Sequence, residues 1–207
     1  MFSYGPKGIH IENSELWIDA HRKVDFSFLS HGHSDHLRNH GKVLATPATL
    51  KFHALRGKQR ETVARNFGQP FFIDDLKVEL FPLGHILGSA MIWIERNGVS
   101  LLYTGDFKTK PSWTAEPIDI PHADILIMES TFGSPEYVFP HSREDLANLL
   151  SDFVQDCFRQ NYRPVVLAYN LGKAQEAMKI LGDRGYRVRV NTSAWELALI
   201  YEQFGVC

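Results

Sequence analysis

Cysteine is scarce in this sequence, and long apolar runs and an excess of either charge are lacking. Its 207 residues include two cysteines, Cys157 and Cys207, whose number and spacing suit neither a disulfide framework nor a cysteine-ligated zinc site. A reducing, cytoplasmic location is therefore expected. No apolar run approaches the ~20 residues that span a bilayer, and the N-terminal residues lack the pattern of a secretory signal. We accordingly expect no association with a membrane.

The charges nearly cancel, with 22 Lys and Arg against 24 Asp and Glu and a formal net charge of −2. This balance excludes a wholly basic nucleic-acid binder, so any basic surface must be local. Hydrophobic residues make up 44% and charged residues 22%, as in ordinary soluble globular proteins, which excludes disordered and collagenous classes. The length fits one large domain, or one domain with part of a second.

Short apolar runs separated by turn residues fill the first 130 residues and predict a β-rich region. Asn97-Gly98, between two of these runs, is typical of a tight hairpin turn. We expect strands at residues 8–12, 15–19, 26–30, 42–45, 71–73, 76–80, 90–95, 99–104 and 124–128.

The pattern changes after Pro140. Ser142, with Asp145 three residues later, predicts a capped helix with apolar residues at helical spacing. Beyond it we expect a strand at 164–168, a helix at 173–181, a strand at 186–190 and a helix at 193–204. The chain therefore divides into a β-rich domain over residues 1–137 and a partial α/β domain over residues 138–207.

Residues 31–36 read His-Gly-His-Ser-Asp-His, which places three imidazoles and one carboxylate directly after an expected strand. Imidazole and carboxylate ligands suit zinc and its neighbours in the divalent series, and mixtures that leave one position open are typical of hydrolytic sites. A lone histidine is more often a packing or surface residue. The density of ligand-type side chains here predicts a metal site.

Four other apolar runs also end at a residue that can bind a metal. These residues are Asp19, His85, Asp106 and Glu129. Strand ends deliver side chains to one edge of a sheet, so we expect these residues to meet the histidine-rich segment. Taken singly, Asp19 or Asp106 is interpreted as an ordinary turn carboxylate, but five such segments together favour one composite site.

Asp19, residues 31–36, His85 and Asp106, in this order, resemble the motifs of the metallo-β-lactamase superfamily. Segments 84–90 and 129–133 are similar to its nucleic-acid-processing β-CASP branch. Segments 5–8, 103–107 and 168–175 most resemble the ligase-associated DNA exonucleases of bacteria. The resemblance implies an α/β fold in which a four-layer αββα sandwich leads into a partial β-CASP domain.

The resemblance also implies roles for individual residues. His31, His33 and His85 bind one divalent cation, Asp35 and His36 bind the other, Asp106 bridges the two, Asp19 orients the ligands, and Glu129 gives structural or acid–base support. The cations are expected to be Zn²⁺, with Mn²⁺ as the alternative. Two of them about 3.5–4 Å apart can hold a bridging hydroxide that attacks a phosphodiester.

Relatives in that branch continue past the equivalent of Cys207 with further histidine motifs, whereas no histidine follows His141 here. If this chain were complete, the second cation would lack its last protein ligand. The acid that protonates the leaving group would also be missing, a loss of typically about 10²–10⁴-fold in rate. The expectation is then a fragment, a weakly active relative or a chain that needs a partner.

Residues 38–65 form a basic stretch with a net charge of +6. It contains Arg38, Lys42, Lys51, Arg56, Lys58, Arg60 and Arg65 against the single acid Glu61. The stretch could hold a phosphate backbone near the metals, or it could be a solvated helix face. We expect Arg38, Lys42 and Lys108 to contact substrate.

The resulting hypothesis is a metal-dependent exonuclease that acts on DNA in repair, in functional association with a DNA ligase. Three alternatives remain open: an RNA-processing nuclease of the same branch, a small-molecule hydrolase of the same fold, and an inactive metal-binding interaction module. A small-molecule hydrolase predicts a closed pocket and salt-insensitive turnover, whereas a nuclease predicts a basic groove and salt-sensitive binding.

Overall fold

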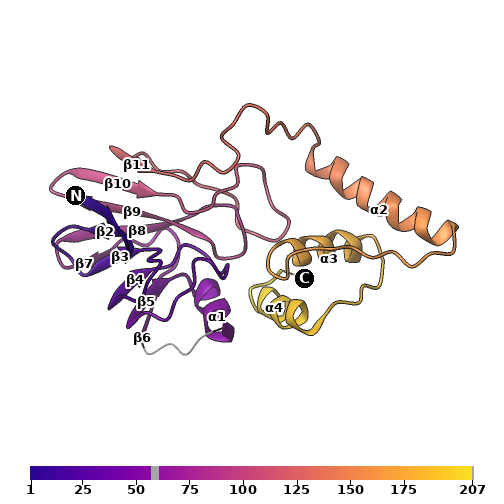
Figure 1. Ribbon diagram of the computed structural model, residues 1–207, viewed down its shortest axis with the longest axis horizontal. Coiled ribbons are helices and arrows are strands. Elements are labelled where there is room, and N and C mark those ends of the chain that lie inside the picture. Colours follow the sequence, from indigo (N-terminus) through magenta and orange to yellow (C-terminus); the bar gives the residue numbers. More distant parts are fainter. Residues whose placement is uncertain (57–60, 207) are drawn as a thin grey trace.

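Two β-sheets packed face to face form the larger part of the computed structural model, which describes residues 1–56 and 61–206 (Figure 1). The first sheet has the spatial order β1-β2-β3-β4-β5-β6. Its strands are β1 (Phe2–Gly5), β2 (Gly8–Ile11), β3 (Leu16–Ile18), β4 (Phe26–Phe28), β5 (Lys42–Ala45) and β6 (Glu61–Ala64). Strands β3 to β6 run parallel, so the segments that follow β3 and β4 leave the sheet at the same edge.

The second sheet has the order β11-β10-β9-β8-β7 and is antiparallel except for the pair β10 and β11. Its strands are β7 (Phe71–Ile73), β8 (Leu76–Pro82), β9 (Ala90–Arg96), β10 (Val99–Tyr103) and β11 (Ile125–Ile127). Asn97 and Gly98 join β9 to β10 with φ angles of 54° and 76°. Positive φ at both positions is the hairpin geometry that this dipeptide favours, which confirms the predicted turn.

Alternating side chains build the core between the sheets. Leu76, Val78 and Leu80 of β8 are fully buried, while the residues between them are partly exposed. They pack with inward-facing residues of both sheets, among them Ile11, Leu16, Ile18, Phe28, Leu44, Ile92, Ile94 and Leu101. Each such side chain contributes about 1.5–3 kcal/mol through burial, so the core holds the strand ends in a fixed frame.

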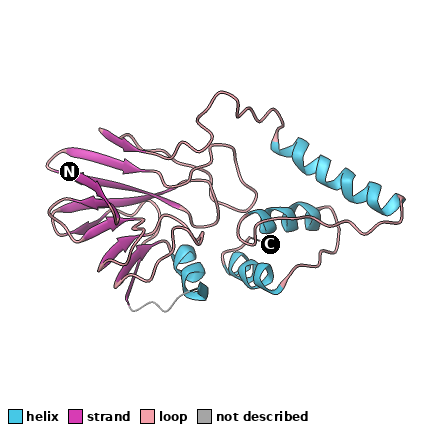
Figure 2. Cartoon of the chain, viewed as in Figure 1, coloured by secondary structure: helices cyan, strands magenta, loops and turns pink. Residues whose placement is uncertain are grey.

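Helices and irregular segments cover the outer faces (Figure 2). Helix α1 (Pro47–Arg56) packs on the first sheet, and segment 107–123 covers the outer face of the second. Residues 138–206, here called the helical part, contain α2 (Arg143–Arg159), α3 (Lys173–Asp183) and α4 (Thr192–Gln203). Helices α1 and α4 meet where the Phe52 ring lies 5.6 Å from that of Tyr201. Within the described ranges, no helix combines the length and apolar character needed to cross a bilayer.

The predicted α/β class is confirmed, and so is the cap of α2. The Ser142 hydroxyl accepts from the Asp145 N–H at 3.1 Å, and the Asp145 carboxylate accepts from the Ser142 N–H at 2.8 Å. The strands expected at 164–168 and 186–190 are wrong, because these segments pair with no other strand in the part of the chain described. Leu167 is 93% exposed there, so apolar composition alone did not produce a strand.

Candidate metal centre

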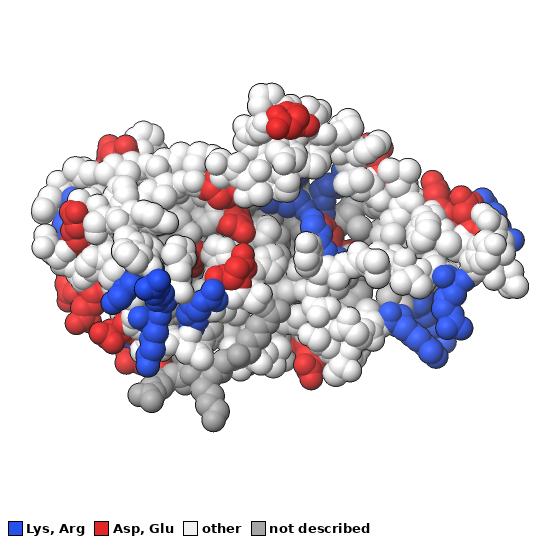
Figure 3. Space-filling model, in the orientation of Figure 1, with Lys and Arg blue, Asp and Glu red and all other residues white. Residues whose placement is uncertain are grey.

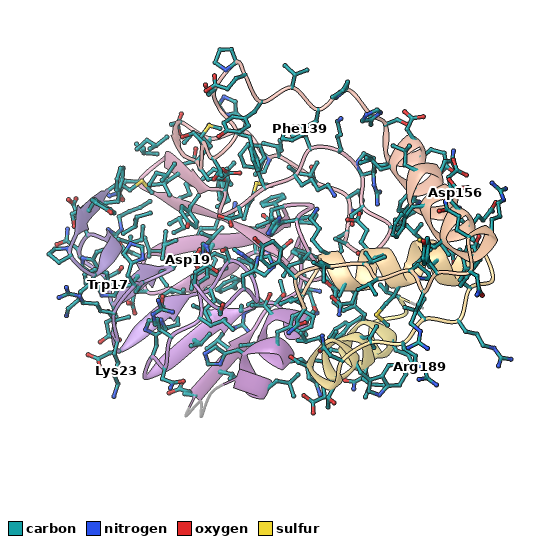
Figure 4. All side chains as sticks on the ribbon, turned by 45° about the vertical axis from the view of Figure 1, so that its right-hand side comes forward. Trp17, Asp19, Lys23, Phe139, Asp156 and Arg189 are labelled. Atoms are coloured by element: carbon teal, nitrogen blue, oxygen red, sulfur yellow. The ribbon has the colours of Figure 1, made fainter. Side chains whose placement is uncertain are left out.

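The predicted metal ligands leave the sheets at one edge. Residues 31–36 follow β4, His85 follows β8, and Asp106 follows β10. Asp19 follows β3 and takes a left-handed φ of 41°. In Figure 4, Asp19 lies toward the middle of the molecule, whereas Trp17, two residues earlier, lies nearer the left-hand edge.

Two glycines let the chain turn directly before a ligand. Gly84 precedes His85 with φ +80°, and a Cβ there would lie 2.4 Å from the Lys108 carbonyl oxygen. Gly105 precedes Asp106 with φ +60°, and its Cβ would lie 2.8 Å from Ser30. Other residues would add both strain and a clash, so glycine is required for each strand end to bring its ligand inward.

His31, His33, His85 and Asp106 converge so that one ligand atom from each lies within 4.8 Å of the others. His33 Nδ1 lies 3.1 Å from His85 Nε2, and His31 Nε2 lies 3.7 Å from Asp106 Oδ2. Two nitrogens bound to one tetrahedral Zn²⁺ at about 2.0–2.1 Å lie about 3.3 Å apart. The spacing therefore fits a transition-metal cation.

The buried His31 ring provides a second test of that fit. His31 Nε2 has no hydrogen-bond partner among the described residues. An unsatisfied buried nitrogen is costly, and a cation between it and the neighbouring ligands would satisfy it.

A second group of ligand atoms adjoins the first. His36 Nε2 lies 3.8 Å from Asp35 Oδ2 and 3.6 Å from Asp106 Oδ1. The two carboxylate oxygens of Asp106 thus approach different histidines, His31 on one side and His36 on the other. This arrangement could hold two cations that share Asp106.

Asp19 orients one histidine in each of the two groups of ligand atoms. Its carboxylate accepts hydrogen bonds from Ser30 N at 2.8 Å, Ser30 Oγ at 2.5 Å, His36 Nδ1 at 2.9 Å and Tyr103 Oη at 2.9 Å. Ser30 Oγ also lies 2.9 Å from His31 Nδ1. Because the hydroxyl donates to Asp19, it accepts from the His31 Nδ1–H, which leaves Nε2 of His31 free to bind a metal. The bond from His36 Nδ1 to Asp19 turns Nε2 of His36 toward Asp35 and Asp106.

Burial keeps the first group of imidazoles neutral. It lowers the pKa of His31 well below its usual value. Burial, with the charges of His33, Lys173 and Lys108, lowers the pKa of His85 to about 3. Neutral imidazole is the form that binds a metal, so these rings need lose no proton at neutral pH.

His36 behaves differently because it faces carboxylates. Burial acts to lower its pKa, but the hydrogen bond and charge of Asp19 outweigh burial and raise the pKa to about 9. Burial raises the pKa of Asp106, and Glu129 adds to this rise through its negative charge. Glu129 therefore acts on the centre through its charge.

The residues predicted to bind substrate have polar partners within the protein. Arg38 donates to the carbonyl oxygens of His21, Ser34 and Leu37. Lys42 Nζ lies 3.1 Å from the Glu61 carboxylate, and Lys108 Nζ lies 3.5 Å from that of Glu176. Lys58 and Arg60 of the basic stretch lie outside the described residues. Lys and Arg atoms are visible in the hollow between the two sheets with their connecting segments (β1 to β11, here called the two-sheet part) and the helices (Figure 3).

Three contributors were missed by sequence reasoning: Ser30, Tyr103 and the Leu171 carbonyl. Ser30 and Tyr103 lie beside predicted motifs, so their position next to His31 and before Gly105-Asp106 could have identified them. The Leu171 carbonyl oxygen lies 3.3 Å from His33 Nε2 across a separation of 138 residues, and no local pattern indicates that contact.

No protein-family model matches the chain. It is 39% identical over 203 residues to a protein of Opitutus terrae named "Probable DNA ligase", covering 96% of this chain and 20% of that protein. It is 35% identical over 112 residues to the "RNase J-like protein" of Methanocaldococcus jannaschii, covering 53% of this chain and 26% of that protein.

A solved structure shares the fold. The crystal structure of a protein of unknown function from Enterococcus faecalis V583 matches with a TM-score of 0.62 at 20% identity, over 87% of this chain and 49% of that chain. The present chain spans 20% and 26% of the length of the two named relatives. With the strand-end ligands in their observed order, these relatives establish that the chain belongs to the β-CASP branch of the metallo-β-lactamase superfamily.

Proposed function

We propose that this chain is a metal-dependent phosphodiester hydrolase that degrades DNA from an end, using two divalent cations, with Zn²⁺ as the first candidate. The observation that carries the proposal is the position of Asp106, whose two carboxylate oxygens lie 3.7 Å from His31 Nε2 and 3.6 Å from His36 Nε2. A shared carboxylate suits a site that holds two cations about 3.5–4 Å apart.

The residues divide between two metal positions. His31, His33 and His85 would hold the first cation, Asp35 and His36 would hold the second, and Asp106 would contact both. Bound cations of this kind activate water and neutralise the charge that develops on a phosphoryl group. The catalytic roles fall to Asp35 and Asp106, with acid–base support from Glu129.

Groups around the centre orient the ligands and attract the substrate. Asp19 holds His36 directly and His31 through Ser30, which fixes the direction in which both rings present Nε2. We assign contacts with the phosphate backbone to Arg38, Lys42 and Lys108. Of these three residues, Lys108 has the strongest support, because its positive charge contributes to the lowered pKa of His85.

The relative that matches nearly the whole chain supports DNA as the substrate, and other relatives leave RNA as the second candidate. A segment similar to nearly all of this chain makes up a fifth of a protein named as a DNA ligase, which supports action on DNA ends during repair, in association with a ligase. The similarity to a protein named RNase J-like favours RNA instead. A cytoplasmic location fits either substrate.

Both candidates can be tested with end-labelled single- and double-stranded DNA and RNA, supplied with Zn²⁺ or Mn²⁺. Asp106→Asn should abolish cleavage. Asp119→Asn makes the same change of charge at an exposed carboxylate and should cleave like the parent chain. Release of mononucleotides from DNA supports the proposal, and cleavage of RNA alone supports the second candidate. Cleavage of neither contradicts both and leaves a small-molecule hydrolase or an inactive metal-binding module.

A further inference from the structure

A backbone group of the helical part reaches the metal centre. The Leu171 carbonyl oxygen lies 3.3 Å from His33 Nε2. A carbonyl oxygen can only accept, so His33 Nε2 carries the hydrogen and His33 Nδ1 stays unprotonated. That free nitrogen lies 3.1 Å from His85 Nε2, on the side where the ligand atoms converge.

The turn that presents this carbonyl is held by Gln175, a side chain only 3% exposed. Its Oε1 accepts from the Gly172 N–H at 2.8 Å. Its Nε2 donates to the carbonyl oxygens of Asn170 at 2.9 Å and Ala194 at 3.1 Å. Gln175 therefore forms hydrogen bonds with the chain on both sides of Leu171 and links the turn to the residues that begin α4.

Apolar packing of the Leu171 side chain also holds this turn in place. It is 2% exposed and packs with Ile86, Leu197 and Ile200. Gly172 has φ +87°, and a Cβ there would lie 2.6 Å from Ile86 Cγ2. The turn is thus clamped by packing on one side and by the Gln175 amide on the other, which leaves its carbonyl directed at His33.

A capping role for α3 explains only part of this geometry. A glutamate at position 175 could accept from the Gly172 N–H equally well. It could not donate to the carbonyl oxygens of Asn170 and Ala194, and its charge would face both of them. The need for an amide therefore arises from the turn and not from the helix cap alone.

We propose that Gln175 is a positioning residue of the metal centre, which holds the Leu171 carbonyl where it sets the tautomer and orientation of His33. The inference rests on the proposed function in that His33 is taken to be a metal ligand. It makes the metal affinity of the two-sheet part depend on an amide in the helical part. Partners that orient metal-binding histidines typically contribute about 10–100-fold in metal affinity.

The test compares Gln175→Leu and Gln175→Glu with Ile200→Val, in the full chain. Ile200→Val loosens the same apolar cluster and leaves every hydrogen bond of Gln175 in place. Zn²⁺ affinity is measured by competition with a chelator. The tautomer of His33 is read from imidazole ¹⁵N shifts in the metal-free protein.

Both Gln175 variants should bind Zn²⁺ about 10-fold more weakly or worse, and their His33 should populate a mixture of tautomers. Ile200→Val should match the parent chain in both measurements. Parent-like values in either folded Gln175 variant, or an equal loss in Ile200→Val, would overturn the proposal. If only one variant folds, that variant decides. Failure of the parent chain to bind Zn²⁺ would instead count against the proposed function, while the tautomer measurement still tests Gln175.

Discussion

Asp19 shows how much one buried carboxylate can organise. It accepts hydrogen bonds from Ser30, His36 and Tyr103, and through the Ser30 hydroxyl it also orients His31. Its hydrogen bond to His36, followed by its charge, is the main reason that the pKa of His36 rises despite burial. The same carboxylate therefore sets the geometry of one ligand and the protonation of another.

Tyr103→Phe tests this organisation with the loss of one hydroxyl. A hydrogen bond to a charged group contributes about 1.5–3 kcal/mol, so the free energy of unfolding should fall by that amount in chemical denaturation. Zn²⁺ affinity should fall about 10-fold, because Asp19 loses a donor that holds it in place. Tyr4→Phe, which removes a hydroxyl from a side chain 75% exposed, is the control and should change neither quantity.

His40 makes stability depend on pH. Burial, with the charge of His53, lowers its pKa to about 4 from a usual value of 6.5. The unfolded chain therefore binds the proton of His40 more readily than the folded chain between these values. The contribution of His40 to stability is complete above pH 6.5 and is lost as the pH drops toward 4. The contribution of His40 to that loss is about 3 kcal/mol, from about 1.4 kcal/mol for each unit of pKa.

His40→Gln should flatten the decline in unfolding free energy between pH 6.5 and 4, measured by denaturation with a chelator present. His31, His33 and His85 also have lowered pKa values, so part of the decline remains in the variant. His122→Gln, at an exposed side chain, should keep the parent slope. An unchanged slope in His40→Gln contradicts this account.

At the scale of elements, most strands and their ends were predicted correctly because alternation and turn residues are local signals, but β1 and β6 were missed. The turns at Asn97-Gly98, Gly84 and Gly105 follow from residue types that tolerate positive φ. Strands 164–168 and 186–190 were predicted from apolar composition and are wrong. A strand needs a neighbouring strand as partner, and composition does not show whether one is present.

Gly105→Ala tests whether a strand end positions a ligand. Both Gly98 and Gly105 flank β10 with positive φ, but a Cβ at Gly98 meets nothing within 4 Å, whereas one at Gly105 lies 2.8 Å from Ser30. Each variant should lose about 1–2 kcal/mol of unfolding free energy through backbone strain. Only Gly105→Ala should also lose Zn²⁺ affinity, because its clash displaces Ser30 and Asp106. Equal Zn²⁺ affinity in both variants would exclude this role.

At the scale of the whole molecule, the candidate centre could be predicted from the sequence because each ligand follows a recognisable strand. His85 and Asp106 meet residues 31–36 as expected. The contact between Leu171 and His33 could not be predicted, since it depends on how the helical part packs against α1. The division into domains at residues 137 and 138 remains a prediction.

The charges between the two-sheet part and the helices indicate where the proposed DNA substrate would bind. Lys173 and Lys108 both act on His85, and Lys173 has a side chain 64% exposed. Lys173→Gln should weaken DNA binding and lower the slope of log affinity against log salt by about 1, with little change in kcat. Lys179→Gln, further along α3 and paired with Asp183, should leave both binding and slope unchanged. An equal effect of the two variants would place the DNA elsewhere.

Anomalous X-ray scattering at the zinc edge, from crystals of the zinc-loaded chain, tests the central claim most directly. We expect two peaks about 3.5–4 Å apart, one on each side of the Asp106 carboxylate. The first should lie among His31, His33 and His85, and the second beside His36. Peaks only at other sites, or none near Asp106, would contradict the account.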